Sequence, residues 1–219
     1  GEGTPMNIYR LSTVGALAAT LLAACATAPT PAELDAQAGK AIKGSFRDQG
    51  IAKIDRLNQD LGQQACSSDK APDDAVADAI KAEALYSVKW PAGGNYIGDW
   101  RAGEKLAQDG RGMTWTDASP DPAANGGNCY NCHQIDKKEI SHGTIGPSLW
   151  NYGKTRGVKD VASPTSAPIV QYTWVKLWNS KAFSACSNMP RFGHKNLLNE
   201  QQLRDIMALL LDPKSPDNQ

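Results

Sequence analysis

The chain has 219 residues, of which 41% are hydrophobic and 21% are charged, so most of it is expected to fold. Its 23 basic residues balance its 23 acidic residues, which indicates neither a nucleic acid nor an anionic membrane surface as a partner. This length favours one compact domain with an extension, or two small domains.

Residues 1–25 have the pattern of a leader and signal peptide. A short basic start at 6–10 precedes an apolar run over 14–24, which is shorter than a bilayer-spanning helix requires. The run ends in Leu-Ala-Ala-Cys25, which resembles the bacterial lipobox, where the cysteine is lipidated and becomes the first mature residue. Ordinary cleavage nearby, for instance after Ala26, is the alternative. Both predict an exported, periplasmic protein, and the first adds a lipid anchor as its contact with the membrane.

Residues 26–95 predict a helical N-terminal extension. One apolar face is indicated by residues at helical spacing: Ile51, Ile54, Leu57 and Leu61. Pro72, followed by two acidic residues, predicts the start of a second helix, with Ile80 and Ala84 on its apolar face. We interpret this region as a surface helical hairpin, with a docking surface for a partner subunit as the alternative. The Pro-Ala-Gly-Gly sequence at 91–94 marks the expected domain boundary.

Residues 96–219 predict a small all-α domain with long loops. Helices are expected over residues 99–108, 171–180 and 199–211. In the last of these, Asn199 can cap the N-terminus, Gln202 occupies the capping-box position and an apolar stripe follows. The segment 111–128 is a loop rich in Gly, Pro and Asn. Loops of this length need a group to pack on.

Residues 129–133 are Cys-Tyr-Asn-Cys-His, the spacing of covalent haem c attachment. On one helical turn, Cys129 and Cys132 can reach both vinyl groups of a porphyrin edge, and His133 then comes under the iron. A thioredoxin-like pair would need flanking strands, and a zinc site would need two further ligands at similar spacing. The sequence indicates neither, so it predicts a single covalent haem.

The iron is expected to have two axial ligands from the chain. His133 is the proximal one, and its Nδ1–H needs an acceptor. The sequence Ile-Gly-Pro-Ser-Leu at 145–149 resembles the Gly-Pro-x-Leu segment of class I cytochromes c, which implies that the Pro147 carbonyl accepts from His133 and that its ring packs on the proximal haem face. Met189 lies in a loop before the last helix, where that class places its distal methionine. The other candidates, which we interpret as packing or surface residues, are Met113, Met207, His142 and His194.

The remaining cysteines and the tryptophans complete the expected site. Cys66 and Cys186 are left over in an oxidising compartment, which suggests a disulfide that joins the extension to the Met189 loop. Free thiols or a bridge to a partner are the alternatives. The six tryptophans are expected to pack around the porphyrin, among them Trp150 and the pair on one helical face, Trp174 and Trp178.

Three segments carry a more specific resemblance, at residues 128–133, 143–149 and 188–193. Together they resemble the SoxX family, the monohaem cytochrome subunit of the SoxAX complexes of bacterial sulfur oxidation. The Asn-Met-Pro-Arg-Phe-Gly run at 188–193 is the most discriminating, because the first two segments would fit many class I cytochromes c. The resemblance covers the predicted domain and leaves the extension outside it.

The resemblance implies a class I cytochrome c fold and a heterodimer with the SoxA cytochrome. The complex joins thiosulfate oxidatively to a cysteine of a carrier protein, an L-cysteine S-thiosulfotransferase activity in which the new bond forms on the SoxA side. This chain would contribute no catalytic residue and would pass electrons to a small cytochrome c. The alternative is a free-standing periplasmic electron carrier that serves an oxidase or a dehydrogenase.

Overall fold

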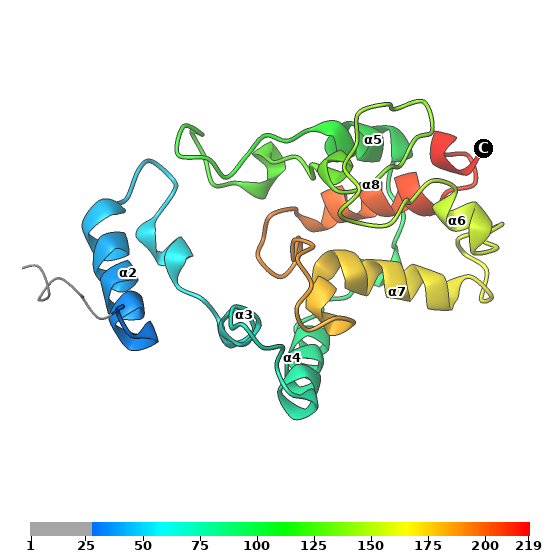
Figure 1. Ribbon diagram of the computed structural model, residues 1–219. Coiled ribbons are helices and arrows are strands. Elements are labelled where there is room, and N and C mark those ends of the chain that lie inside the picture. Colours follow the sequence, from blue (N-terminus) through cyan, green and yellow to red (C-terminus); the bar gives the residue numbers. More distant parts are fainter. Residues whose placement is uncertain (1–27) are drawn as a thin grey trace, which may run out of the picture. The chain divides into compact units, whose positions relative to one another are not determined.

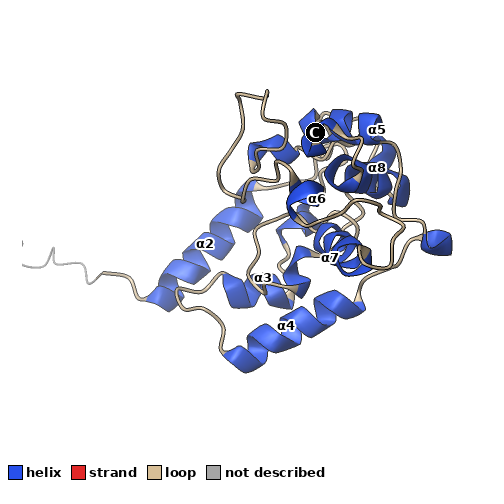
Figure 2. Cartoon of the chain, turned by 90° about the vertical axis from the view of Figure 1, so that its right-hand side faces the viewer, coloured by secondary structure: helices blue, strands red, loops and turns tan. Residues whose placement is uncertain are grey.

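The structure is a computed structural model that describes residues 28–219, so the predicted signal peptide and Cys25 lie outside the described residues (Figures 1 and 2). The chain divides into two units, one up to Arg47 and one from Asp48 to Gln219. The described residues form helices and no strands, with one isolated bridge between Gln49 and Ala52. The all-α prediction is confirmed for this part of the chain. None of its helices combines the length and the apolar character that a membrane crossing requires.

The described part of the first unit contains one helix, α2 (Pro31–Ser45). Its start is fixed by a capping box, in which Thr30 and Glu33 satisfy each other's backbone N–H groups. No residue of α2 is buried, and the large apolar side chains Leu34 and Ile42 are exposed.

The second unit begins with η2 (Ile54–Leu57), α3 (Leu61–Cys66), α4 (Asp74–Tyr86) and η3 (Ala92–Gly94). The apolar face expected over residues 51–61 does not form, because the chain turns at Gly50, whose φ is +50°, and Asp48 accepts a hydrogen bond of 2.8 Å from the Ile54 N–H. Leu61, at the start of α3, is 73% exposed. The second predicted helix is present: Asp73 caps α4, which buries Ile80 and Ala84.

Residues 48–95 pack in the same compact unit as residues 96–219. Two buried tryptophans of α7 (Ala167–Trp178) hold the segment after α4: Trp174 Nε1 donates to Lys89 O at 2.9 Å, and Trp178 Nε1 donates to Ser87 O at 3.0 Å. A disulfide between Cys66 and Cys186 ties α3 to the loop before the last helix, as the cysteine count suggested. These links explain why no break in packing falls near residue 95.

The remaining elements surround the core in chain order: α5 (Trp100–Gln108), η4 (Pro122–Ala124), η5 (Cys129–Asn131), α6 (Tyr152–Thr155), α7, η6 (Ser180–Ala182), α8 (Glu200–Leu211) and η7 (Pro216–Asn218). The capping box of α8 is confirmed, with Asn199 accepting from the Gln202 N–H at 2.9 Å. Helix α7 starts earlier than predicted because Pro168 is tolerated in its first turn.

Helices α5 and α8 cross in close contact and form one wall of the core (Figure 1). Gly98 N donates to Arg204 O at 2.9 Å, and Asp99 N donates to the buried Asp205 side chain at 2.9 Å. A Cβ on Gly103 would lie 2.1 Å from Asp205 O, so a glycine is required where the helices meet. The fully buried Leu203 and Met207 fill the core side of α8.

Candidate functional site

The Cys-Tyr-Asn-Cys-His sequence forms a single tight turn. The 3-10 helix η5 starts after Asn128, which adopts a left-handed conformation with φ +50°. The backbone N–H groups of Cys132 and His133 both donate to Cys129 O, at 3.1 and 2.9 Å. This single turn therefore places two thiols and an imidazole close to one another along the backbone.

Both thiols of the turn are free and half-buried, whereas the other two cysteines of residues 28–219 are bonded to each other. Cys129 packs against the hydrophobic core. Burial of its sulfur, reinforced by the adjacent Cys132, raises the pKa of Cys129 to about 12, so this thiol stays protonated at neutral pH.

The imidazole of His133 is oriented by a backbone carbonyl. Its Nδ1 lies 2.6 Å from Pro147 O. Because a carbonyl can only accept, Nδ1 must carry the proton, and this leaves the lone pair of Nε2 available to a metal. The geometry agrees with the acceptor role expected for Pro147.

The loop that carries Pro147 runs beside the turn and is bonded to it along its length. Three backbone hydrogen bonds join them: Gly143 N to Tyr130 O at 2.7 Å, Gly146 N to Cys132 O at 2.8 Å, and Leu149 N to Gln134 O at 2.7 Å. The imidazole lies against Gly146, where a Cβ would come within 2.1 Å of the ring carbon Cε1. Sequence reasoning missed this role of Gly146, although the Gly-Pro pair was a signal for it.

Met189 lies in the loop between η6 and α8 and packs, half-buried, against the same core as Cys129. The loop is fixed at this point, because Ser180 Oγ donates to Met189 O at 2.6 Å. Phe192, which follows, is buried. Nothing in the sequence singled out Ser180, since an isolated serine has no pattern.

The other ligand candidates have different environments. Met207 is fully buried on α8, and Met113 lies in a loop with φ +64°, where its carbonyl accepts from Arg56. His142 Nδ1 lies 3.2 Å from the carbonyl of Gly143, and His194 is exposed beside α3.

The tryptophans are divided between the core and the surface. Trp174 and Trp178 stack at 6.1 Å between ring centroids inside the core, as their shared helical face suggested. Trp90 and Trp115 are more than half exposed and lie outside the helices, and packing of the tryptophans around a porphyrin stays a prediction.

The residues of the turn fit a covalently attached porphyrin. Two free thiols would supply the attachment, and an imidazole whose Nδ1 is already hydrogen-bonded would offer Nε2 to the iron. Beside them, large apolar side chains face solvent: Ile145, next to Gly146, is 80% exposed, and Trp150 is 38% exposed. Exposed apolar surface of this kind is typical of a binding site, and a porphyrin face would cover it.

The chain is similar to known proteins in two respects. The family model described as Cytochrome c matches residues 101–213. A protein of Aquifex aeolicus (strain VF5) named "Uncharacterized lipoprotein" is 37% identical over 166 residues, which cover 73% of this chain and 73% of that protein.

Proposed function

We propose, on the premise that this chain belongs to the cytochrome c family, that it is an electron carrier of an exported redox system. The family holds haem c covalently and transfers electrons through it, so haem c is the cofactor of this chain. The observation that best supports the assignment of the site is the 2.6 Å contact between His133 Nδ1 and Pro147 O, next to two free thiols.

Each residue of the proposed site has one role. Cys129 and Cys132 form the two thioethers, and His133 binds the iron through Nε2. The Pro147 carbonyl orients that imidazole and increases its basicity. Met189 supplies the sixth ligand, and its thioether favours ferrous iron, so we expect a higher reduction potential than two imidazoles would give. When bound, haem supplies the one-electron couple of its iron.

Haem attachment is tested by extraction. Denatured protein should keep its haem through acid–acetone, and the double variant Cys129→Ser with Cys132→Ser should lose it. Loss of haem from the unmodified chain would refute the attachment.

The sixth ligand is tested by spectroscopy. Met189→Ala should abolish the weak sulfur-to-iron band that the ferric protein shows at the red end of the visible spectrum, and it should change the potential. Met113→Ala, the matched control in another loop, should change neither. An unaltered band in Met189→Ala would assign the sixth ligand to a different residue.

The finer proposal is that this chain is the SoxX-type subunit of a SoxAX complex. The sequence at 188–193 supports it, and three side chains of that run have defined places: Met189 packs against the core, Arg191 pairs with Asp60, and Phe192 is buried. A periplasmic location with Cys25 lipidated is supported by the lipobox-like sequence and by the name of the Aquifex relative.

In this proposal the chemistry is divided between two subunits. SoxA forms the bond between thiosulfate and the carrier-protein cysteine, with release of two electrons. This chain receives the electrons and passes them to a small cytochrome c. Electron transfer needs close haem edges, so we expect the residues that flank Met189, such as Arg191, to border the interface.

The test is a reduction assay with purified components. Thiosulfate alone should leave the haem of this chain oxidised, and thiosulfate with SoxA and the carrier protein should reduce it. Reduction that proceeds equally well without SoxA would favour the free-standing carrier instead.

A further inference from the structure

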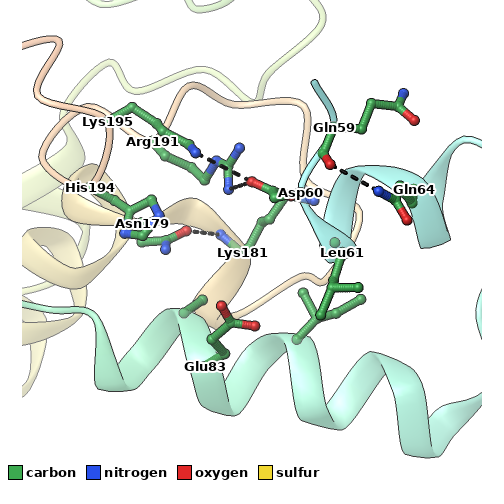
Figure 3. Close-up of a pocket in the computed structure, with 13 residues that line it drawn as sticks. Gln59, Asp60, Leu61, Gln64, Glu83, Asn179, Lys181, Arg191, His194 and Lys195 are labelled. Atoms are coloured by element: carbon green, nitrogen blue, oxygen red, sulfur yellow. Dashed lines mark hydrogen bonds and ion pairs between the residues drawn. The ribbon is translucent and has the colours of Figure 1, made fainter. Parts of the chain in front are cut away.

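Helix α3 is fastened at both ends to the loop that carries Met189. At its start, the carboxylate of Asp60 accepts from Arg191 Nη1 at 2.7 Å and lies 3.4 Å from Lys195 Nζ (Figure 3). At its end, Cys66 is bonded to Cys186. The two attachment points of the loop therefore lie on either side of Met189, three positions before it and two after it.

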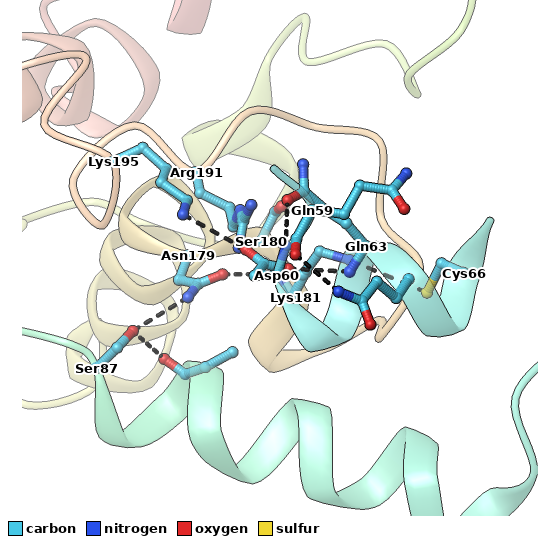
Figure 4. Close-up of polar contacts among 12 residues, drawn as sticks. Gln59, Asp60, Gln63, Cys66, Ser87, Asn179, Ser180, Lys181, Arg191 and Lys195 are labelled. Carbon is cyan, nitrogen blue, oxygen red and sulfur yellow. Dashed lines mark hydrogen bonds and ion pairs between the residues drawn. The ribbon is translucent and has the colours of Figure 1, made fainter. Parts of the chain in front are cut away.

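The disulfide has a buried ammonium beside it. Lys181 is 7% exposed, and its Nζ lies 4.0 Å from Cys66 Sγ and 2.7 Å from Ala185 O (Figure 4). No carboxylate of the described residues lies within salt-bridge distance of it. The nearest carboxylate that acts on it is Asp60, which is already paired with Arg191 and Lys195. An ammonium buried without a directly paired counterion is costly, which makes this position unusual for a lysine of purely structural role. Burial and the charge of Arg191 lower the pKa of Lys181, and Asp60 only partly opposes them.

The two sulfurs differ in access. Cys186, in the loop, is exposed, whereas Cys66, the last residue of α3, is half-buried. An external thiolate therefore reaches Cys186 first, and attack there expels Cys66 as the leaving group. The leaving thiolate forms next to the Lys181 ammonium, at the 4.0 Å contact between Lys181 Nζ and Cys66 Sγ, and so gives it a directly adjacent counterion.

We propose that the Cys66–Cys186 disulfide is a redox-active site, reducible by a dithiol protein or small dithiol, and that its reduction releases the Met189 loop. Lys181 is the positioning and charge-stabilising residue of this site. Opposite charge within 4–6 Å lowers a pKa by about 1–3 units, and a thiol of lower pKa leaves faster.

The exchange balances as a two-electron reduction. One thiolate of the dithiol attacks Cys186 Sγ, the bond between the two protein sulfurs breaks, and the electron pair goes to Cys66. The second sulfur of the reductant then attacks the first one, which is bonded to Cys186 in the mixed disulfide, and releases Cys186. The reductant ends as a disulfide and gives up two protons, one to the Cys186 thiolate and one to solvent. The protein ends with a thiol at Cys186 and a thiolate at Cys66 paired with Lys181.

Release of the disulfide leaves the loop held by weaker contacts. The Arg191–Asp60 pair and the Ser180–Met189 hydrogen bond remain, but each is non-covalent. Residue 186 then regains chain freedom, so we expect Met189 to leave the iron more often. This step rests on the proposed ligand role of Met189, whereas the exchange at the disulfide does not.

The exchange is tested on the folded haem-containing protein at neutral pH. The protein is incubated with dithiothreitol, samples are quenched with acid, and thiols are counted after tagging with a maleimide of known mass. The disulfide should open in the folded state, and Lys181→Met should slow its opening on the order of tenfold. Lys181→Arg should restore most of the rate, and Lys214→Met, at an exposed lysine that lines a different cavity, should leave it unchanged. Equal rates in Lys181→Met and the unmodified chain, or a disulfide that opens only in denaturant, would overturn the proposal.

The effect on the loop has its own measurement. Protein with reduced and alkylated cysteines is reoxidised at the haem, and the rate of cyanide binding to ferric iron is compared with that of the disulfide form. We expect binding to be several-fold faster after reduction. An unchanged rate, with the sulfur-to-iron band present in both forms, would refute the coupling. If the band is absent from the unmodified chain, the ligand role of Met189 fails, and the thiol counts still decide whether the disulfide is redox-active.

Discussion

The hydroxyl of Ser180 donates a 2.6 Å hydrogen bond to the backbone carbonyl of Met189. Ser180 is fully buried at the start of η6, directly after α7, so this bond fixes the Met189 loop to the end of a core helix.

Ser180→Ala should therefore destabilise the protein, because it leaves the Met189 carbonyl without its partner. Loss of a buried partner costs about 1–3 kcal/mol. Chemical denaturation followed by circular dichroism measures the change. Ser184→Ala, which alters an exposed serine of the same loop, is the control and should have little effect. Equal stabilities of the two variants would contradict a role for this bond.

Gly146→Ala should disturb the proximal side of the haem site. The new Cβ would overlap the imidazole of His133, with three ring atoms between 2.1 and 2.7 Å away. Overpacking of this kind typically costs about 1–3 kcal/mol, and here it would also displace the imidazole proposed as the iron ligand. The absorption spectrum and the haem content of purified protein report the effect. Gly44→Ala, at a position with no neighbour within 4 Å, is the control and should keep both.

Asp60→Asn should weaken the protein in a pH-dependent way. Partial burial alone would raise the pKa of Asp60, but hydrogen bonds from Arg191 and the Gln63 backbone outweigh it and lower this pKa to about 2. A carboxylate with a depressed pKa contributes stability above its unfolded value of 3.8 and loses it as the pH falls through about 2. The contribution is about 1 kcal/mol after allowance for solvent screening.

The measurement is the free energy of unfolding of both proteins at several pH values. The gap between the unmodified chain and Asp60→Asn should be largest above about pH 4 and should close toward about pH 2. A gap that stays constant with pH would show that the carboxylate charge makes no contribution.

Asp217 should make stability depend on pH in the opposite sense to Asp60, and Asp217→Asn should remove that dependence. Burial raises the pKa of Asp217 to about 7, although backbone N–H groups of Asn151 and Tyr152 partly oppose it, and one carboxylate oxygen has no hydrogen-bond partner in the structure. Because the folded pKa lies above the unfolded value of 3.8, the folded state binds the proton more tightly. The unmodified chain should lose stability as the pH rises from about 4 to about 7.

The variant lacks this titration, so its free energy of unfolding should depend less on pH in that range. The expected difference between the two profiles is a few kcal/mol at most, read at about pH 5 and about pH 8. Asp212→Asn, on the same C-terminal segment, is the control, and its free energy of unfolding should change with pH as steeply as that of the unmodified chain. Parallel profiles for Asp217→Asn and the unmodified chain would refute the role of this carboxyl.

The sequence predicted most of what depends on local chemistry. The capping box of α8, the cap of α4 and the Cys-Tyr-Asn-Cys-His turn follow from neighbouring residues, and the structure has all three. The Gly-Pro pair also indicated the acceptor for His133, whose contact with Pro147 O spans 14 positions.

Features that depend on distant packing were harder to predict. The expected apolar face over 51–61 failed because Gly50 turns the chain before a helix can form, and spacing alone does not reveal a turn of this kind. The tryptophan contacts to Ser87 and Lys89 bring together residues 85 to 91 positions apart, and no local signal marks a backbone carbonyl as their acceptor. Ser180 and Lys181 hydrogen-bond to backbone carbonyls of the Met189 loop. Their roles can be recognised only from the position of that loop in the folded protein.

The crossing of α5 and α8 has a consequence for the order of assembly. The bond between Asp99 and Asp205 spans 106 positions, and the segment that it closes contains every residue assigned here to haem. Closing a loop of that length costs about 4 kcal/mol in chain entropy, so the helix pair forms late. Until α8 has been synthesised, α5 has no partner helix to pack against. The thiols of Cys129 and Cys132 then lie on a segment that has not yet folded. Haem attachment can thus precede folding, and the attached porphyrin would then serve as the surface on which α5 and α8 meet.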